Sequence, residues 1–243
     1  MRSLTDLRAM AADALPILRL DRFALIAEVK RTSPSAGVLE RQGLDVVAQA
    51  SQYAQAGVAM ISVLTEPSRF GGSETDLRAI AAAVEAPVMR KDFLVDPYQV
   101  YEARTWGASA VLLIARMLDD GLLASMLDAC ADAGLSVLLE AFDAADLERS
   151  ARAIEGRSGV LLGLNCRDLA TLHEDISRFA ELAGAFPPGV PRIAESGIAT
   201  ADDAAHVAAL GYDGVLVGTA LMRADEPAAL ARAIIDAGRA ARG

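Results

Sequence analysis

The sequence has few of the residues that build disulfide-rich or zinc-binding domains. Among its 243 residues there are two cysteines and two histidines. Cys130 and Cys166 form no paired CxxC motif, and His173 and His206 are isolated from each other. The sequence therefore indicates neither a disulfide framework nor a zinc site, and both cysteines are expected to pack in the core. Any chemistry must use carboxylates, amines and the backbone.

Long hydrophobic runs and an excess of basic residues are also absent. No apolar run approaches the roughly 18 residues that cross a bilayer, and the first residues do not resemble a cleavable signal peptide. The 23 Lys+Arg face 33 Asp+Glu, which gives a net charge of −10. Nucleic acids and anionic membranes attract basic surfaces, so neither is an expected partner. The sequence predicts a cytoplasmic protein that acts on a small molecule.

What is present is a regular alternation of two kinds of segment. Short runs rich in Leu and β-branched residues, typical of buried strands, alternate with longer Ala-rich stretches typical of amphipathic helices. Gly57, Gly107, Gly134 and Gly211 follow helical stretches, where a left-handed conformation costs glycine least. Eight strands are predicted, over residues 23–30, 59–64, 87–91, 110–115, 136–140, 159–164, 192–195 and 214–217.

Eight βα units without an internal linker predict one α/β domain, a (β/α)8 TIM barrel over residues 23–243 with a short N-terminal extension at residues 1–22. Within the extension, the spacing of Leu4, Leu7 and Met10 predicts one small helix, and Pro16 breaks the segment after it. The alternative is a doubly wound open sheet. A barrel predicts polar residues at nearly every strand exit, whereas an open sheet concentrates them at a switch point.

The strand exits favour the barrel, because each predicted strand ends in polar residues or glycine. Side chains alternate along a strand, so Glu28 and Lys30 share one face. Cations at the strand exits of a protein with net negative charge suggest an anionic ligand. Carboxylates beside these cations can shift the pKa values of lysine and glutamate side chains apart, so that one lysine acts as an acid and one glutamate as a base. The candidate residues are Glu28, Lys30, Lys91, Glu140, Asn165, Arg167 and Glu195.

The last two strand exits suit a phosphate group. Ser196-Gly197 and Gly218-Thr219 combine small residues with expected helix starts, which lets backbone N–H groups approach phosphate oxygens. A phosphate site is therefore expected near Gly197, Gly218 and Thr219. The glycines within residues 69–73 lack the lysine of a nucleotide P-loop, and this stretch is predicted to be a plain loop.

In their order along the chain these residues resemble the indole-3-glycerol phosphate synthase family of tryptophan biosynthesis. The resemblance is continuous from about residue 23 and is carried by EVKRTSPSAG at 28–37, ISVLTE at 61–66, PVMRKDF at 87–93, DPYQ at 96–99, LLIA at 112–115, NCRDL at 165–169, ESGI at 195–198 and VGTALM at 217–222. It implies a carboxy-lyase without metal or organic cofactor. Its substrate, 1-(2-carboxyphenylamino)-1-deoxyribulose 5-phosphate, would be ring-closed, decarboxylated and dehydrated to indole-3-glycerol phosphate.

The resemblance implies catalytic roles for residues at three strand exits. Lys91 matches the general acid that acts on the ribulose carbonyl, and Glu140 matches the carboxylate that transfers a proton during dehydration. Glu28 and Lys30 match a charged pair at the first strand, with Lys30 near the substrate carboxylate. The division of acid roles between Lys30 and Lys91 is left open.

The resemblance also implies how the substrate is held. Asn165 and Ser196 would position hydroxyls and the reacting centre, and Arg167 would pair with Glu195 to hold the geometry of the site. The remaining binding residues are expected to be Ser33, Gly197, Gly218 and Thr219 for the phosphate, and Pro34 and Phe93 for the aromatic ring.

Three positions depart from the family pattern. Family members often have a histidine near Phe142 and a lysine at Ala36, and they commonly have a longer segment before the first strand. The short extension predicts a more open active site, with weaker substrate binding but preserved chemistry.

Two other functions are compatible with the fold. Phosphoribosylanthranilate isomerase, a related sugar-phosphate barrel, uses a cysteine base on the first strand, where this sequence has Glu28. A homologue that binds phosphosugars without turnover is the second, and intact Lys30, Lys91 and Glu140 argue against it. The expected partner is a phosphorylated small molecule, bound by a monomer or a weak homodimer.

Overall fold

The computed structural model describes residues 3, 5, 6, 20–34, 37–39, 44–168 and 171–242. The helix expected around Leu4, Leu7 and Met10, and the break expected at Pro16, lie outside the described residues. The more open active site inferred from that extension therefore stays a prediction.

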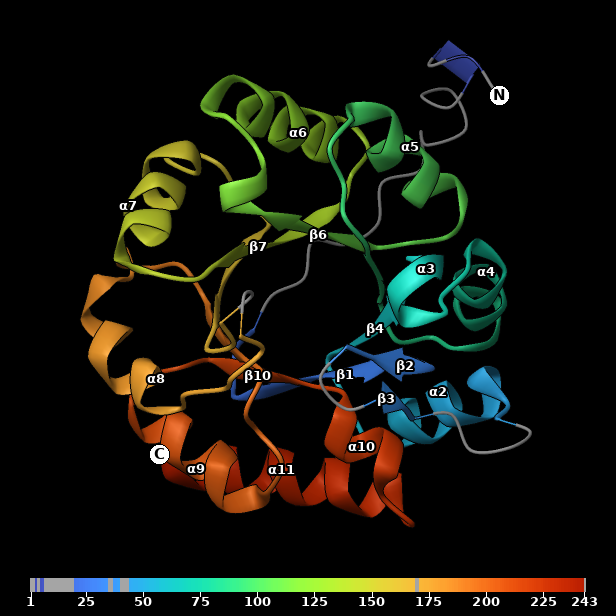
Figure 1. Ribbon diagram of the computed structural model, residues 1–243, viewed down its shortest axis with the longest axis vertical. Coiled ribbons are helices and arrows are strands. Elements are labelled where there is room, and N and C mark those ends of the chain that lie inside the picture. The colour runs from blue at the N-terminus through green and yellow to red at the C-terminus, as the bar shows by residue number, and fades with distance from the viewer. Residues whose placement is uncertain are drawn as a thin grey trace.

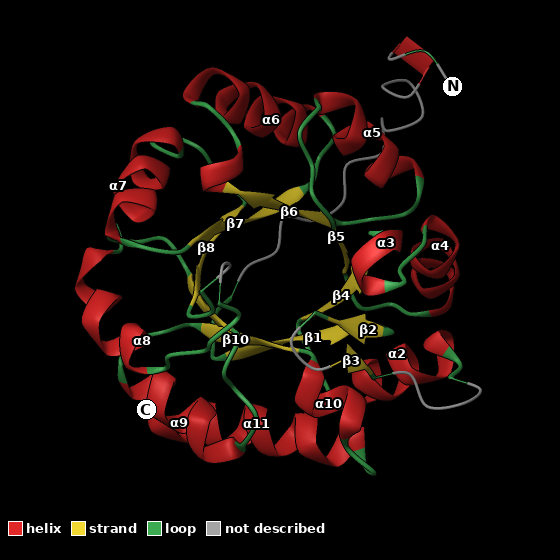
Figure 2. Ribbon diagram, in the orientation of Figure 1, coloured by secondary structure: helices red, strands yellow, loops and turns green. Residues whose placement is uncertain are grey.

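Eight parallel strands close into a barrel in the order β1-β10-β9-β8-β7-β6-β5-β4, and they form a ring at the centre of the molecule (Figure 2). All eight predicted strands are present, and their ends differ from the predicted ends by at most one residue. The open-sheet alternative is wrong, because β1 pairs with both β4 and β10 and the sheet therefore closes on itself. The strands are β1 (Ala24–Val29), β4 (Met60–Leu64), β5 (Val88–Lys91), β6 (Ala110–Ile114), β7 (Ser136–Ala141), β8 (Val160–Asn165), β9 (Arg192–Glu195) and β10 (Gly214–Val217). A hairpin of β2 (Thr32–Ser33) and β3 (Gly37–Val38) follows β1.

Helices surround the barrel on its outside (Figure 1). Asp96 and Thr200 each cap the first turn of the helix that follows. The helices are α2 (Val46–Gln55), α3 (Pro67–Phe70), α4 (Glu74–Ala83), α5 (Pro97–Thr105), η1 (Ala115–Met117), α6 (Asp120–Asp132), α7 (Ala144–Ala153), α8 (Ser177–Leu182), η2 (Ala183–Ala185), α9 (Ala201–Ala209), α10 (Thr219–Arg223) and α11 (Pro227–Arg242). Among the described helices, none is both long and apolar enough to cross a membrane.

Glycines end several helices as predicted. Gly57, Gly107, Gly134 and Gly211 all have positive φ angles, and at Gly107 the angle is 95°. A side chain would be strained in that conformation, so glycine lets each chain segment turn directly from helix to strand.

Helix α3 corrects one expectation. The stretch at residues 69–73 is predicted to be a loop, yet Arg69 and Phe70 lie in this one-turn helix. The Glu66 carboxylate accepts hydrogen bonds from the backbone N–H groups of Ser68, Arg69 and Phe70, and Gly71 ends the turn with a φ of 64°. The prediction fails because a single turn is too short to show a helical period in its apolar residues.

Side-chain alternation along the strands separates two apolar cores. Outward residues such as Leu25 and Ala27 pack against the helices, and this outer core also holds Cys130 and Cys166, as predicted for both cysteines. Inward residues fill the barrel, among them Ile26, Met60, Met89, Leu112, Leu138, Leu161, Ile193 and Leu216. At the carboxyl ends of the strands the inward residues become charged, and the candidate site begins there.

Candidate active site

A cavity of about 680 Å³ opens at the carboxyl ends of the barrel strands. Residues from every strand exit line it, which is the arrangement predicted for a barrel enzyme. The predicted residues that line the cavity are Glu28, Lys30, Lys91, Phe93, Glu140, Asn165, Arg167, Glu195, Ser196, Gly197, Gly218 and Thr219. Ser33 and Pro34 are not in its wall: Ser33 is buried in the hairpin after β1, and Pro34 is exposed. Their roles stay predictions.

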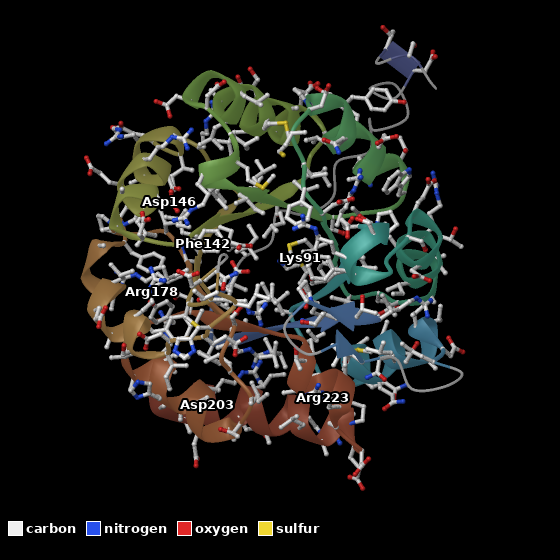
Figure 3. The ribbon with its side chains drawn as sticks, in the orientation of Figure 1. Lys91, Phe142, Asp146, Arg178, Asp203 and Arg223 are labelled. Carbon is white, nitrogen blue, oxygen red and sulfur yellow. The ribbon has the colours of Figure 1, made fainter. Side chains whose placement is uncertain are left out.

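Four ionisable side chains gather at the floor of the cavity. Glu28, Lys91, Glu140 and Glu195 come from β1, β5, β7 and β9, the first, third, fifth and seventh barrel strands along the chain. Alternate strands contribute to the same layer of a barrel interior, and this geometry brings residues far apart in sequence together. Figure 3 shows Lys91 near the centre of the ring.

Lys91 is the central cation of this layer. Its Nζ lies 3.6 Å from Oε2 of Glu140, and 18% of its side chain is exposed, toward the cavity. Burial alone lowers the pKa of a lysine, but the carboxylates of Glu140, Glu28 and Glu195 outweigh it and raise the pKa of Lys91 above its ordinary value. Lys91 therefore holds a proton at neutral pH.

Asn165 fixes the carboxylate that faces Lys91. Its Nδ2 donates a hydrogen bond of 2.9 Å to Oε1 of Glu140, and its Oδ1 accepts one of 3.0 Å from the backbone N–H of Arg167. Both ends of the amide are engaged, so its orientation is determined. The other carboxylate oxygen of Glu140, Oε2, faces Lys91 and the cavity.

Lys30 forms a second, deeper ion pair. Its Nζ lies 2.7 Å from Oε1 of Glu28, and both side chains are buried. Burial opposes ionisation of Glu28, yet Lys30 and Lys91 lower its pKa below the ordinary value. Lys30 and Lys91 are the two lysines of the whole chain, and both lie in this cavity.

Glu195 has the most unusual environment of the cluster. It is 1% exposed, and neither carboxylate oxygen has a hydrogen-bond partner among the described residues. Burial and the neighbouring charge of Glu140 raise its pKa well above the ordinary value. Its carboxylate lies against Gly163, where any Cβ atom would overlap Oε1. Gly163 therefore makes the space that Glu195 occupies.

The expected pairing of Arg167 with Glu195 is wrong. Arg167 instead pairs with Glu174, and the two residues also form a short antiparallel bridge. The chain after β8 folds back on itself, with the backbone N–H of Asp175 bonded to the carbonyl of Cys166. Glu174 is close enough to pair with Arg167 because it lies only seven residues away on the same folded loop.

The exits of β9 and β10 have the tight geometry expected for anion binding. Ser196 and Gly197 have consecutive positive φ angles of 68° and 69°, and Gly218 caps the short helix α10. A Cβ on Gly218 would overlap Oε1 of Glu28 and lie 3.0 Å from Nζ of Lys30. The absence of that Cβ lets the Lys30 ammonium reach this side of the cavity.

The opposite side of the cavity is apolar, and most of its residues were not among the predicted site residues. The rings of Phe70 and Phe93 lie 6.4 Å apart, and Glu66 holds Phe70 in place by capping α3. The other apolar lining residues from this side are Leu64, Leu112, Ile114, Met117 and Phe142. Strand alternation places Leu112 and Ile114 inward and could have identified them, whereas Phe70 depends on a turn that shows no sequence period.

Glu195→Gln should change how stability depends on pH. The folded-state pKa of Glu195 lies above its ordinary value of 4.5, so the parent protein loses stability as pH rises from 4.5 through that raised pKa. The variant has no charge to bury, and its free energy of unfolding should exceed that of the parent by a margin that widens from about pH 5 to about pH 8. Denaturant unfolding at several pH values measures this margin.

Glu28→Gln provides the control of opposite sign. The pKa of folded Glu28 lies below 4.5, so its charge stabilises the parent and this contribution is lost as pH falls through the lowered pKa. The variant should therefore be less stable than the parent by a margin that is constant above about pH 5 and shrinks at lower pH. A Glu195→Gln margin that stays constant or narrows as pH rises would contradict the environment described for Glu195.

The model of the family described as indole-3-glycerol phosphate synthase matches residues 9–234. The indole-3-glycerol phosphate synthase of Beutenbergia cavernae is 44% identical over 95% of this chain and 84% of its own length. That of Mycobacterium avium is 43% identical over 97% of this chain and 87% of its own.

Solved structures confirm the architecture alone. The crystal structure of 3-hexulose-6-phosphate synthase from Salmonella typhimurium aligns with a TM-score of 0.69 at 18% identity, covering 88% of this chain and 98% of that one. The structural match supports the barrel fold, but at this low sequence identity it says nothing about activity. The family model and the relatives span nearly the whole described barrel, and the chain belongs to the indole-3-glycerol phosphate synthase family.

Proposed function

We propose that this cavity closes the ring of 1-(2-carboxyphenylamino)-1-deoxyribulose 5-phosphate, with Lys91 as the first proton donor and Glu140 as the proton acceptor. The family activity is that of a carboxy-lyase. The observation that carries the residue roles is the Lys91–Glu140 pair, 3.6 Å apart, which faces a cavity between an apolar wall and two small-residue turns.

The two sides of the cavity suit the two ends of this substrate. The phosphate would lie at the turns of Ser196-Gly197 and Gly218-Thr219, where backbone N–H groups favour an anion. The carboxyphenyl ring would lie against Phe70 and Phe93. The ribulose carbon chain would then cross the floor of the cavity above Lys91.

Ring closure needs an acid at the ribulose carbonyl. As the aromatic carbon that bears the carboxylate attacks the carbonyl carbon, the carbonyl oxygen gains negative charge, and Lys91 transfers its proton to that oxygen. Loss of carbon dioxide then leaves its bonding electrons in the ring and restores aromaticity. Lys30, paired with Glu28, balances the substrate carboxylate before it leaves.

Dehydration needs an acid and a base together. The new hydroxyl leaves as water after protonation by a lysine, and Glu140 takes the proton released from the adjacent ring carbon. Asn165 holds Glu140 in the orientation required. The two oxygens of Glu195, which have no hydrogen-bond partner among the described residues, would bond the hydroxyls of the sugar chain.

A monomer or a weak homodimer is proposed, because the described residues of one chain supply the acid, the base and both sides of the cavity. A cytoplasmic location is proposed on the chemistry of the substrate. Its phosphate and carboxylate charges make passage through a bilayer costly, so the enzyme must share a compartment with the source of its substrate.

Lys91→Met should abolish turnover while the barrel still folds. The change keeps a long apolar stem and removes the proton, and a general acid is typically worth about 10²–10⁴-fold in rate. Glu140→Gln should likewise lower kcat more than it raises KM. Indole fluorescence from the product measures the rate. Arg152→Met, which removes an exposed cation on α7, is the matched control and should keep the parent rate. A Lys91→Met enzyme that retains more than about half of the parent kcat would refute the assignment.

Thr219→Asp should remove protection by inorganic phosphate. An anion that binds only the folded state raises the unfolding temperature, and a carboxylate at the start of α10 would repel it. Thr219→Asn has nearly the same shape without the charge and should keep most of the protection. Thermal unfolding with and without phosphate measures both. Equal protection in parent and Thr219→Asp would place the phosphate site elsewhere.

A further inference from the structure

One residue of the apolar wall, Phe142, is held by side chains from two helices. Phe142 follows Glu140 by two positions, so its side chain faces the barrel interior like that carboxylate. It is 2% exposed, packs in the inner core with Phe93 and Leu112, and lines the cavity. The ring therefore forms part of the surface that a substrate meets.

The backbone of Phe142 is fixed by two helices. Its N–H donates a hydrogen bond of 2.9 Å to Oδ2 of Asp146 on α7, and its carbonyl accepts one from Arg178 on α8. Asp146 is itself buried, so its bond is shielded from water. Figure 3 shows Phe142, Asp146 and Arg178 together on the β7, α7 and α8 side of the barrel.

The ring of Phe142 is covered by a cation that is also fixed. The guanidinium of Arg116 on η1 lies 4.3 Å from the ring centroid. Two carboxylates hold that guanidinium, with Nη2 lying 2.6 Å from Asp146 and 2.8 Å from Asp143. The same Asp146 thus bonds the backbone of Phe142 and the cation above its ring, and this clamp prevents the ring from swinging out of the cavity.

Other buried aromatic residues show a different arrangement. Phe179 and Phe186 pack edge-on against Tyr212 in the outer core, and none of the three lines the cavity. Phe142 is therefore a buried aromatic residue whose rigidity affects the shape of the site itself. An apolar pocket with a rigid wall separates ligands by size, and one methylene is worth about 10–200-fold in kcat/KM.

We propose that Phe142 is a specificity-determining residue that limits the size of the aromatic ring this enzyme accepts, and that the Arg116–Asp146 clamp makes the limit rigid. The inference rests on the proposed function, because it assumes that the carboxyphenyl ring lies on the apolar side. Phe142 bounds that side beyond Leu112, Ile114 and Phe93, so ring substituents that point toward β7 meet its face.

The test compares the unsubstituted substrate with analogues that carry one methyl group at each free position of the carboxyphenyl ring. The measured quantity is the ratio of kcat/KM for analogue and unsubstituted substrate. In Phe142→Ala this ratio should rise by at least about tenfold over the parent ratio for one or more positions, because the truncated wall makes room for the methyl group. Phe142→Leu, which keeps the core filled, should raise the ratio less.

Phe186→Leu is the matched control, since it removes a buried ring outside the cavity, and its ratios should equal those of the parent. Asp146→Asn should raise the ratio slightly by loosening the clamp. If a Phe142 variant folds but turns over too slowly to measure, the dissociation constants of the same compounds are measured instead. The ratio of affinities for analogue and unsubstituted substrate should then rise in the same way.

Unchanged ratios in both Phe142 variants, or equal changes in Phe186→Leu, would overturn the proposal. If the parent protein fails to convert the unsubstituted substrate, the proposed function itself is wrong and the size limit falls with it. The two failures are therefore distinguished by the parent reaction alone.

Discussion

The site depends on the cost of burying a charged lysine, and on the carboxylates that offset it. Lys91 is kept protonated by Glu28, Glu140 and Glu195, which share its layer of the barrel. Lys30 adds a second ammonium, so two cations face three carboxyl groups. Burial and the charge of Glu140 raise the pKa of Glu195, so its ionisation is the one that this layer opposes. Burial of Lys91 is tolerable because carboxylates offset its charge, and removing a stabilised carboxylate such as Glu28 leaves a buried ammonium less compensated.

The barrel supplies this arrangement through its geometry. Four strands that alternate around the ring each place one ionisable residue in a common layer, while the strands between them place small or apolar residues there. Gly163 is the clearest example, because its missing side chain is what admits the carboxylate of Glu195. On either side of this charged floor the cavity divides into a wall of aromatic and aliphatic residues and two turns suited to an anion. The chemistry and the binding surfaces are therefore separate parts of one rigid frame.

The sequence predicts much of this, for physical reasons that also explain the failures. Strands were located within one residue because buried parallel strands are short apolar runs, and the charged residues that end them stand out against those runs. The scarcity of lysine is a signal that the prediction did not use, although both lysines of the chain lie in the cavity. The pairing of Arg167 was mispredicted because it depends on how the loop after β8 folds back to bring Glu174 near. Phe70 was missed because a one-turn helix leaves no periodic trace. Phe142 was missed because the predicted strand ends at residue 140, although alternation from Glu140 places it inward.

The carboxylates around Lys91 hold its proton in place in the free enzyme. Since the chain has two lysines, protein labelled with ¹³C at the lysine Cε gives two side-chain signals by nuclear magnetic resonance, and Lys91→Met assigns them. Titration of the free enzyme should show Lys91 still protonated above its ordinary pKa of 10.5, and Glu140→Gln should move the pKa of Lys91 downward. A Lys91 signal that titrates below 10.5 in the parent protein, or that Glu140→Gln leaves unchanged, would contradict the account.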